Sequence, residues 1–306
     1  MILFESRLEV IVVMMILEWL KAVLYGIVEG ITEWLPVSST GHLILIEDWL
    51  PFVFSSDATF LAEFGEMFQV VIQLGAILAV VILFFEKLWP FSRKKTAEEK
   101  RGTWTLWFKV LVASIPAALV GVVGDKILEK LSGKDIDGWL YNSIVVAAAL
   151  IVYGIAFLVV ERLHRGEMAK VESVDQISYK TAFFIGMFQM LSIVPGTSRS
   201  GSTILGSMLL GLSRTAGAEF SFFMAIPAMV GASAIKLLGF GSWVLENGVQ
   251  VPSAAWIVLA IGFLVSFVVS LMAIRFLMDF VKKHSFAPFG IYRIALGVLV
   301  LLLWVI

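Results

Sequence analysis

Residues 184–203 read FIGMFQMLSIVPGTSRSGST, and residues 24–43 read LYGIVEGITEWLPVSSTGHL. The two stretches share a layout in which Gly26 corresponds to Gly186 and, after a one-residue gap, the Pro-centred segments align. Because proline and glycine interrupt helices, each stretch predicts an apolar helix that breaks and then resumes at a run of Ser and Thr. The pattern therefore indicates an internal repeat of a broken helix.

The composition around these stretches is that of a membrane protein. Of the 306 residues, 59% are hydrophobic and 15% are charged, and the mean hydropathy is +0.95. Soluble globular proteins are about half apolar and about a quarter charged. A helix needs about 20 apolar residues to cross the hydrocarbon core, where backbone groups must be hydrogen-bonded internally. We therefore predict an all-α, polytopic integral membrane bundle with about six full spans, near residues 67–85, 106–124, 140–160, 217–240, 254–278 and 288–306.

The composition also excludes several classes of site and partner. The chain has no cysteine, which excludes disulfides, thiolate metal sites and a cysteine nucleophile. The net charge is −1, and the sequence lacks the basic footprint of a nucleic-acid-binding protein. We expect membrane lipids, and no nucleic acid, as partners.

Lysine and arginine are distributed unevenly between the loops. Clusters of these residues occur at 86–105, 161–180 and 275–293, whereas 46–65 and 239–253 contain neither. The positive-inside rule places the first three stretches in the cytoplasm and the last two outside.

This sidedness constrains the segment 181–211. A single crossing there would put the basic stretch 275–293 outside, yet about 30 residues are too few for two spans of about 20 residues each. We therefore predict a re-entrant helical hairpin at 181–211 and, from the repeat, a second one at 17–50. Three full spans lie between them, so the hairpins enter from opposite faces as an inverted-topology repeat. The expected organisation is one membrane domain over 1–306, with halves at about 15–162 and 177–306.

Glu29 and Glu33 are the first candidates for chemistry. They are four residues apart and so project from one helix face. Two carboxylates at membrane depth are costly unless they are paired, protonated or bound to a cation. The pair is a candidate site for a divalent cation, Mg²⁺ first and Ca²⁺ as the alternative, and one acid would otherwise serve as a general base. The structural alternative is a helix near the interface with both acids in water.

Ser38, Ser39 and Thr40 follow the first break and read as the N-cap of the next helix. The free N–H groups and positive dipole end of such a helix suit a phosphate group. A hydroxyl with His42 and a glutamate nearby is the arrangement of an activated nucleophile. We predict Ser39 and His42 as catalytic and Ser38 and Thr40 as substrate-binding; a purely capping role is the alternative.

Arg199 occupies the corresponding position after the second break. A guanidinium binds phosphate oxygens in a bidentate manner and stays charged when desolvated, and an arginine at membrane depth indicates function. The alternative is a structural arginine paired with Glu29 or Glu33, and a resting pair that opens to admit phosphate reconciles the two. The neighbouring residues predicted to bind substrate are Thr197, Ser198, Ser200 and Gly201.

Both motifs resemble those of bacterial undecaprenyl-diphosphate phosphatases. Residues 29–43, EGITEWLPVSSTGHL, look like the glutamate-rich motif of that family, and residues 195–201, PGTSRSG, look like its second motif. The order and separation agree, as do the flanking segments 73–79, QLGAILA, and 219–222, EFSF. The resemblance covers about residue 15 to the end of the chain.

The resemblance implies hydrolysis of undecaprenyl diphosphate to undecaprenyl phosphate and inorganic phosphate, which recycles the carrier lipid for cell-wall synthesis and confers bacitracin resistance. It also implies a divalent cation and a site open to the outer, periplasmic side of the bacterial inner membrane. The acidic pair of the family falls on Glu29 and Glu33, its histidine on His42 and its arginine on Arg199. Nucleophiles proposed for the family match Ser39 and His42. Whether the chain forms a homodimer stays open.

A transporter or flippase for a phosphorylated lipid is the main alternative, because inverted repeats of broken helices are common in transporters. Transport alone does not require a cluster of hydroxyls, imidazole, acids and guanidinium. A second class of membrane lipid phosphatase places a histidine at a fixed distance after Ser-Arg, and Ser198-Arg199 lacks it. The mechanism we expect is attack by Ser39 on the terminal phosphorus, aided by His42 or an acid.

Overall fold

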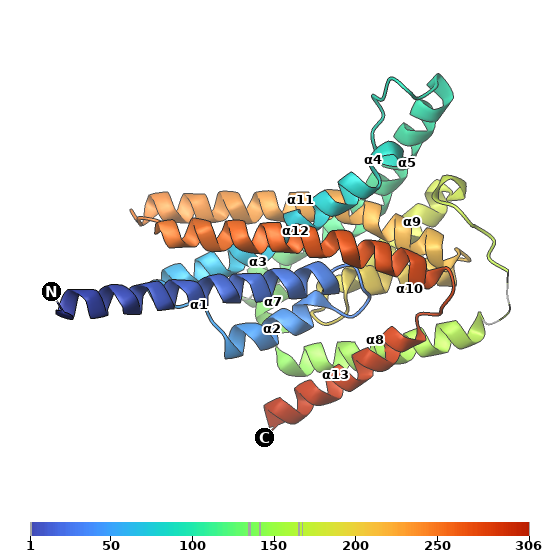
Figure 1. Cartoon of the computed structure of the whole chain (residues 1–306). Helices are drawn as coiled ribbons and strands as arrows, with labels where there is room; N and C mark the ends of the chain where they lie inside the picture. Colours follow the sequence, from blue (N-terminus) through green and yellow to red (C-terminus); the bar gives the residue numbers. More distant parts are fainter. Residues whose placement is uncertain (1, 134–135, 141, 165, 167, 306) are drawn as a thin grey trace.

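The computed structural model describes residues 2–133, 136–140, 142–164, 166 and 168–305. Within them the chain is helical, with one isolated bridge between Val171 and Leu212, so the all-α prediction is confirmed for this part. The longer helices are α1 (Ile2–Thr32), α2 (Ser39–Trp49), α3 (Ala58–Leu83), α5 (Ala97–Ala118), α8 (Ser143–Leu163), α9 (Tyr179–Met190), α10 (Arg199–Leu209), α11 (Arg214–Glu246), α12 (Ser253–Val281) and α13 (Ala287–Val305) (Figure 1). The shorter elements are α4 (Phe85–Leu88), α6 (Asp125–Ser132), α7 (Ile136–Leu140), the π-helix η1 (Leu119–Gly124) and the 3₁₀ turns η2 (Val174–Gln176) and η3 (Leu191–Ile193).

Several of these helices have the length and apolarity of membrane spans. In the described part of the chain five segments qualify: Ala58–Leu83, Ala97–Ser132, Ser143–Leu163, Arg214–Glu246 and Ser253–Val281. They coincide with five of the predicted windows, and α13, a shorter apolar helix, occupies the sixth. The chain is therefore a multi-pass membrane protein.

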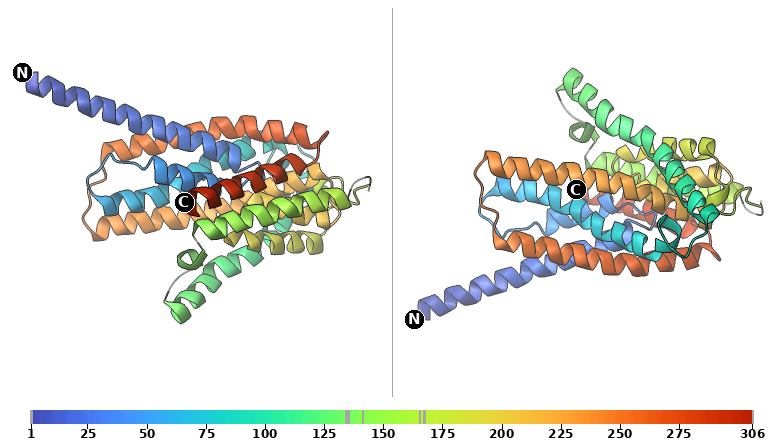
Figure 2. Two further views of the ribbon diagram at one scale, coloured as in Figure 1. Left: turned by 90° about the horizontal axis from the view of Figure 1, so that it is seen from below. Right: turned by 90° about the horizontal axis from the view of Figure 1, so that it is seen from above.

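Glycines allow the helices to approach closely. Gly26 and Gly30 lie on α1 where a Cβ would be 2.7 Å and 2.8 Å from the backbone oxygens of Gly262 and Ser266 on α12. The residue numbers of the contacting positions increase together along both helices, so α1 and α12 run parallel. Small residues bring membrane helices together in this way. The N-terminal part of α1 continues beyond the rest of the bundle (Figure 2), and the helix begins at Ile2, not near residue 17 as the predicted hairpin did.

The α8–α13 pair is built in the same manner. Gly154 of α8 and Gly290 of α13 face each other so closely that a Cβ on either would lie 2.7–2.8 Å from the other's backbone oxygen. Figures 1 and 2 show these helices side by side along their lengths. This contact fixes α13 beside the segments that follow α1 and α9.

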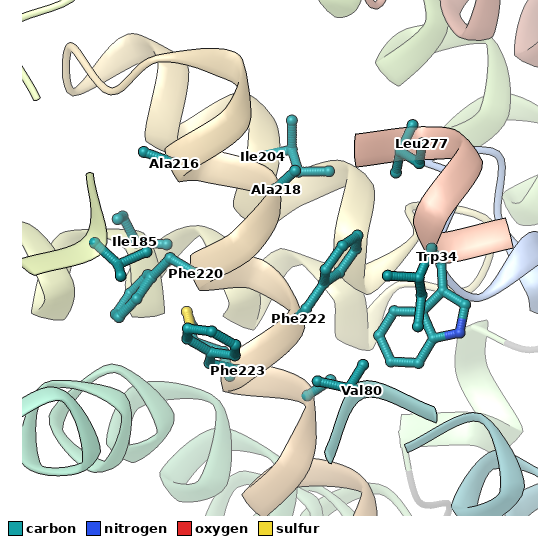
Figure 3. Packing of buried hydrophobic residues seen from close by; sticks show 14 of the residues in the cluster. Trp34, Val80, Ile185, Ile204, Ala216, Ala218, Phe220, Phe222, Phe223 and Leu277 are labelled. Carbon is teal, nitrogen blue, oxygen red and sulfur yellow. The ribbon is translucent and has the colours of Figure 1, made fainter. Parts of the chain in front are cut away.

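A buried apolar cluster anchors the break after α1. Trp34, directly after Glu33, is fully buried, and its ring meets Phe222 of α11 edge-on at 5.1 Å between centroids. Figure 3 shows the indole beside Phe222, Val80 and Leu277. Because these neighbours come from three other helices, Trp34 locks the turn that presents Glu33.

The two breaks have the same local geometry. Ser38 has φ 74° and Ser198 has φ 71°, and they are the positive-φ residues other than glycine in the described part of the chain. Each hydroxyl accepts a hydrogen bond from the amide three residues on, Gly41 at 3.4 Å and Gly201 at 3.0 Å. The predicted N-caps are thus confirmed, and α9 to α10 spans 179–209, close to the predicted 181–211.

Candidate active site

The two motifs meet through an ion pair. Arg199, the first residue of α10, donates from Nε and Nη2 to Oε1 of Glu33 at 3.2 Å and 3.1 Å. Its Nη1 donates to the carbonyl of Ser221 at 2.8 Å, and the guanidinium lies 5.9 Å from the ring centre of Trp34. The Arg199 and Glu33 side chains are only 12% and 5% exposed. The predicted pairing of Arg199 with one of the acids is therefore present, and Glu33 is the partner.

Ser39 completes this arrangement from the first turn of α2. Its hydroxyl donates to Oε2 of Glu33 at 3.0 Å, and the residue is buried. Glu33 thus holds the guanidinium on one oxygen and the hydroxyl on the other. A serine hydroxyl directed at a carboxylate has the geometry of a nucleophile beside its general base.

The His42 ring is hydrogen-bonded to groups other than the Ser39 hydroxyl. Nδ1 lies 2.7 Å from the Ser38 carbonyl and Nε2 lies 2.6 Å from the hydroxyl of Tyr292 on α13. A carbonyl only accepts, so Nδ1 carries the hydrogen; when the ring is neutral, Nε2 therefore accepts from the Tyr292 hydroxyl. The two rings are also stacked, 5.7 Å apart between centroids. Of the two groups considered as the base for Ser39, His42 or an acid, it is the acid Glu33 that is hydrogen-bonded to the Ser39 hydroxyl.

Glu29 is buried without a hydrogen-bond partner. The residue is 0% exposed, and neither carboxylate oxygen is hydrogen-bonded. It lies close enough to Glu33 and Arg199 to interact with both electrostatically. A buried, unsatisfied carboxylate is costly unless a proton or a cation joins it. Its oxygens, with those of Glu33, fit a hard divalent cation.

The acids alone make an incomplete cation site. Among the described residues no group of three or more His, Asp or Glu side chains gathers. A hard cation bound by Glu29 and Glu33 would take its remaining oxygen ligands from phosphate and water, as Mg²⁺ at phosphate sites does.

The sequence matches a known family over nearly its whole length. Residues 22–299 match the model of the bacitracin resistance protein BacA family, a range that includes both breaks and most of α13. This chain belongs to the BacA family. It is 50% identical to an undecaprenyl-diphosphatase of Streptococcus mutans serotype c, over 94% of the chain and 96% of that protein. It is 48% identical to an undecaprenyl-diphosphatase of Enterococcus faecalis and 50% identical to one of Streptococcus pyogenes serotype M1, each over 94% of the chain and 97% of the relative.

The other predicted binding residues of this BacA-family chain lie in the two breaks and in the first turns of α2 and α10. Ser200 donates to the Glu33 carbonyl at 3.0 Å, and its hydroxyl is 3.2 Å from that of Ser198. Thr197 is buried, whereas Thr40 is half-buried in the first turn of α2. The capping role considered for these hydroxyls is present at Ser38 and Ser198. Whether any of the predicted residues also touches substrate stays a prediction.

Two residues of α13 were missed by the sequence reasoning. Tyr292 holds His42, and Arg293 donates to the carbonyls of Pro36, Gly196 and Thr197 at 3.1, 2.8 and 2.8 Å. The basic stretch 275–293 predicts a cytoplasmic position for Arg293, and this prediction is wrong: Arg293 is 0% exposed and lies inside α13, which begins at Ala287. An ionisable residue within an apolar span is the signal that would have identified it.

Proposed function

We propose that this BacA-family chain is an undecaprenyl-diphosphate phosphatase. It releases inorganic phosphate from undecaprenyl diphosphate and leaves undecaprenyl phosphate. The names of relatives at about half identity support this substrate. The observation that carries the chemistry is the contact of Ser39 and Arg199 with opposite oxygens of one buried carboxylate, Glu33. These residues supply a nucleophile, Ser39, a base, Glu33, and a guanidinium that can bind phosphate, Arg199.

We also propose that the two broken segments are re-entrant hairpins in a bundle of six spans. α1 runs parallel to α12, and the stretch 239–253, from the end of α11 to the start of α12, has no Lys or Arg. α9 follows the basic stretch 161–180. The positive-inside rule then has α1 entering from the outer side and α9 from the cytoplasm. This orientation supports a site in the bacterial inner membrane that opens outward.

The first chemical step transfers the terminal phosphoryl group to Ser39. Arg199 turns from Glu33 to the phosphate oxygens, and Glu33 takes the Ser39 proton as Oγ bonds to phosphorus. The anhydride P–O bond breaks, and undecaprenyl phosphate leaves with the electron pair. Water then attacks the phosphorus of the phosphoserine, the Oγ–P bond breaks, and Glu33 returns its proton to Ser39 Oγ as phosphate departs with the water oxygen and its protons. Fixed charges in a site of low dielectric stabilise the charge that develops at phosphorus.

The cation belongs to this proposal. Held by Glu29 and Glu33, it would neutralise phosphate charge when bound. Mg²⁺ is the first candidate and Ca²⁺ the second. The orphaned oxygens of Glu29 support the assignment.

The experiment is phosphate release from undecaprenyl or farnesyl diphosphate by the purified protein. Ser39→Ala should lower kcat by at least about 10³-fold, because it removes the nucleophile. Ser114→Ala is the matched control, since Ser114 hydrogen-bonds only within α5, to Val110, and it should leave turnover unchanged. Full turnover by Ser39→Ala would reject Ser39 and favour His42 or direct attack by water. Absence of release by folded wild-type protein would favour the transporter.

A further inference from the structure

Arg293 connects the two breaks through their backbones. Nη1 donates to Pro36, in the break between α1 and α2, and Nη2 donates to Gly196 and Thr197, in the break between α9 and α10. The side chain has no exposed surface, and its guanidinium lies 5.6 Å from the ring centre of Tyr153 on α8. One side chain of α13 therefore contacts two segments that are about 160 residues apart.

The breaks require donors of this kind. Pro36, Gly196 and Thr197 lie between helices, so their carbonyls have no intrahelical partner and need another donor. Inside a membrane no water replaces those partners, so another group of the protein must donate. The guanidinium is a rigid fork of several donors, and here it satisfies carbonyls of both breaks at once. A lysine has one compact ammonium and lacks this fork.

The contact also sets the direction of peptide groups at the start of α10. All described peptide bonds are trans, and in a trans peptide the N–H points opposite to the C=O. With the Thr197 carbonyl directed at Arg293, the amide of Ser198 points away from the guanidinium. Gly201 permits the close approach, since a Cβ there would lie 3.1 Å from Nη1 of Arg293. Arg293 thus fixes the orientation of the peptide groups at the start of α10, the helix that begins with Arg199.

We propose that Arg293 is a positioning residue, which holds the two breaks in register so that Ser39 and Arg199 reach the same carboxylate. Ser39 and Glu33 belong to the first broken segment and Arg199 to the second. Their meeting therefore depends on the separation of the two segments, and Arg293 spans that separation. The catalytic part of this inference rests on the proposed phosphatase activity.

The test compares Arg293→Met and Arg293→Lys with wild type, and Arg275→Met, an exposed arginine on α12, is the matched control. In monodisperse protein, Arg293→Met should lower kcat at least about tenfold while KM changes less than about threefold, and Arg293→Lys should recover part of the loss. A residue needed only for folding would lower the yield and leave kcat of the folded protein unchanged. If Arg293→Met does not fold, Arg293→Lys is measured instead: a fall in kcat with little change in KM supports the proposal, and an unchanged kcat contradicts it.

A second readout does not depend on activity. Because the chain has no cysteine, spin labels can be placed at Trp49→Cys, at the end of α2, and Leu209→Cys, at the end of α10; both positions are exposed. The distance distribution between the labels should broaden in the Arg293 variant and stay unchanged in the Arg275 control. An unchanged distribution, or an Arg293→Met variant with kcat within about twofold of wild type, would overturn the proposal. Inactive wild-type protein would instead reject the phosphatase, and the labels would still report on Arg293.

Discussion

Removing both partners of the buried Arg199–Glu33 pair should cost less stability than the sum of the two single removals. Arg199→Met leaves the Glu33 carboxylate, 5% exposed, without its counter-ion. Glu33 accepts two hydrogen bonds from Arg199, and bonds to charged groups contribute about 1.5–3 kcal/mol each. Breaking a buried ion pair costs about 3–5 kcal/mol, which agrees with that sum. We expect each single variant, Arg199→Met and Glu33→Met, to lose about this much.

The double variant Arg199→Met/Glu33→Met removes both charges. Its loss should be smaller than the sum of the single losses by about 2–3 kcal/mol, the upper range for residues in direct contact. Activity should behave differently: all three variants should be inactive, because Arg199→Met removes the phosphate-binding group, Glu33→Met removes the base, and the double variant removes both. The double variant should lose about 2–3 kcal/mol less than that sum while its turnover stays lost, and this separates the stabilising role of the pair from its proposed catalytic role.

Unfolding by SDS in mixed micelles, followed by circular dichroism, measures the stabilities, and phosphate release measures turnover. Arg275→Met combined with Glu33→Met is the control, and these two changes should be additive. Additive losses for Arg199 and Glu33 would refute the argument that their interaction dominates the buried site. Near-normal phosphate release by Arg199→Met would remove the guanidinium from the chemistry.

Three further predictions follow from single contacts. Glu29→Gln should raise the Mg²⁺ concentration needed for half-maximal phosphate release at least about tenfold. It should not lower stability, since the carboxylate has no hydrogen bond to lose. An unchanged Mg²⁺ titration would remove Glu29 from the cation site. Tyr292→Phe keeps the ring on His42 but removes the donor to Nε2, so kcat should fall by about two- to tenfold; a gain in kcat would show that Tyr292 restrains a reactive His42. Gly30→Ala places a Cβ 2.8 Å from the Ser266 oxygen and should lower the free energy of unfolding by about 1–3 kcal/mol. Gly102→Ala has open space around it and should be neutral. Equal SDS midpoints for the two variants would contradict this packing.

The features predicted from the sequence are those set by local pattern. Apolar length predicted the spans, and Pro and Gly followed by Ser predicted the breaks and their caps at Ser38 and Ser198. These signals are local because hydrogen bonding within a helix depends on neighbours along the chain. The meeting of Arg199 with an acid was also expected, because a buried cation in a membrane needs a partner.

The choice of partners could not be read from the chain. Ser39 donates to Glu33, and His42 contacts a tyrosine 250 residues away. The His42 contact depends on how α13 packs beside the first break, which no local pattern specifies. Arg293 shows the same limit: a positive charge near the end of a basic stretch looks like a loop residue until the start of α13 is known. The start of α1 was likewise missed, because the charged residues before Glu18 interrupt the apolar pattern.

In the resting contact, the Glu33 carboxylate occupies the Arg199 guanidinium and so competes with phosphate for it. A tethered group competes at an effective concentration of about millimolar or higher, so a weakly bound anion such as chloride would fail to displace it. A diphosphate, with more charge and more oxygens, would succeed. After the reaction the carboxylate would recapture the guanidinium and expel the orthophosphate, and the enzyme would resist inhibition by one of its own products.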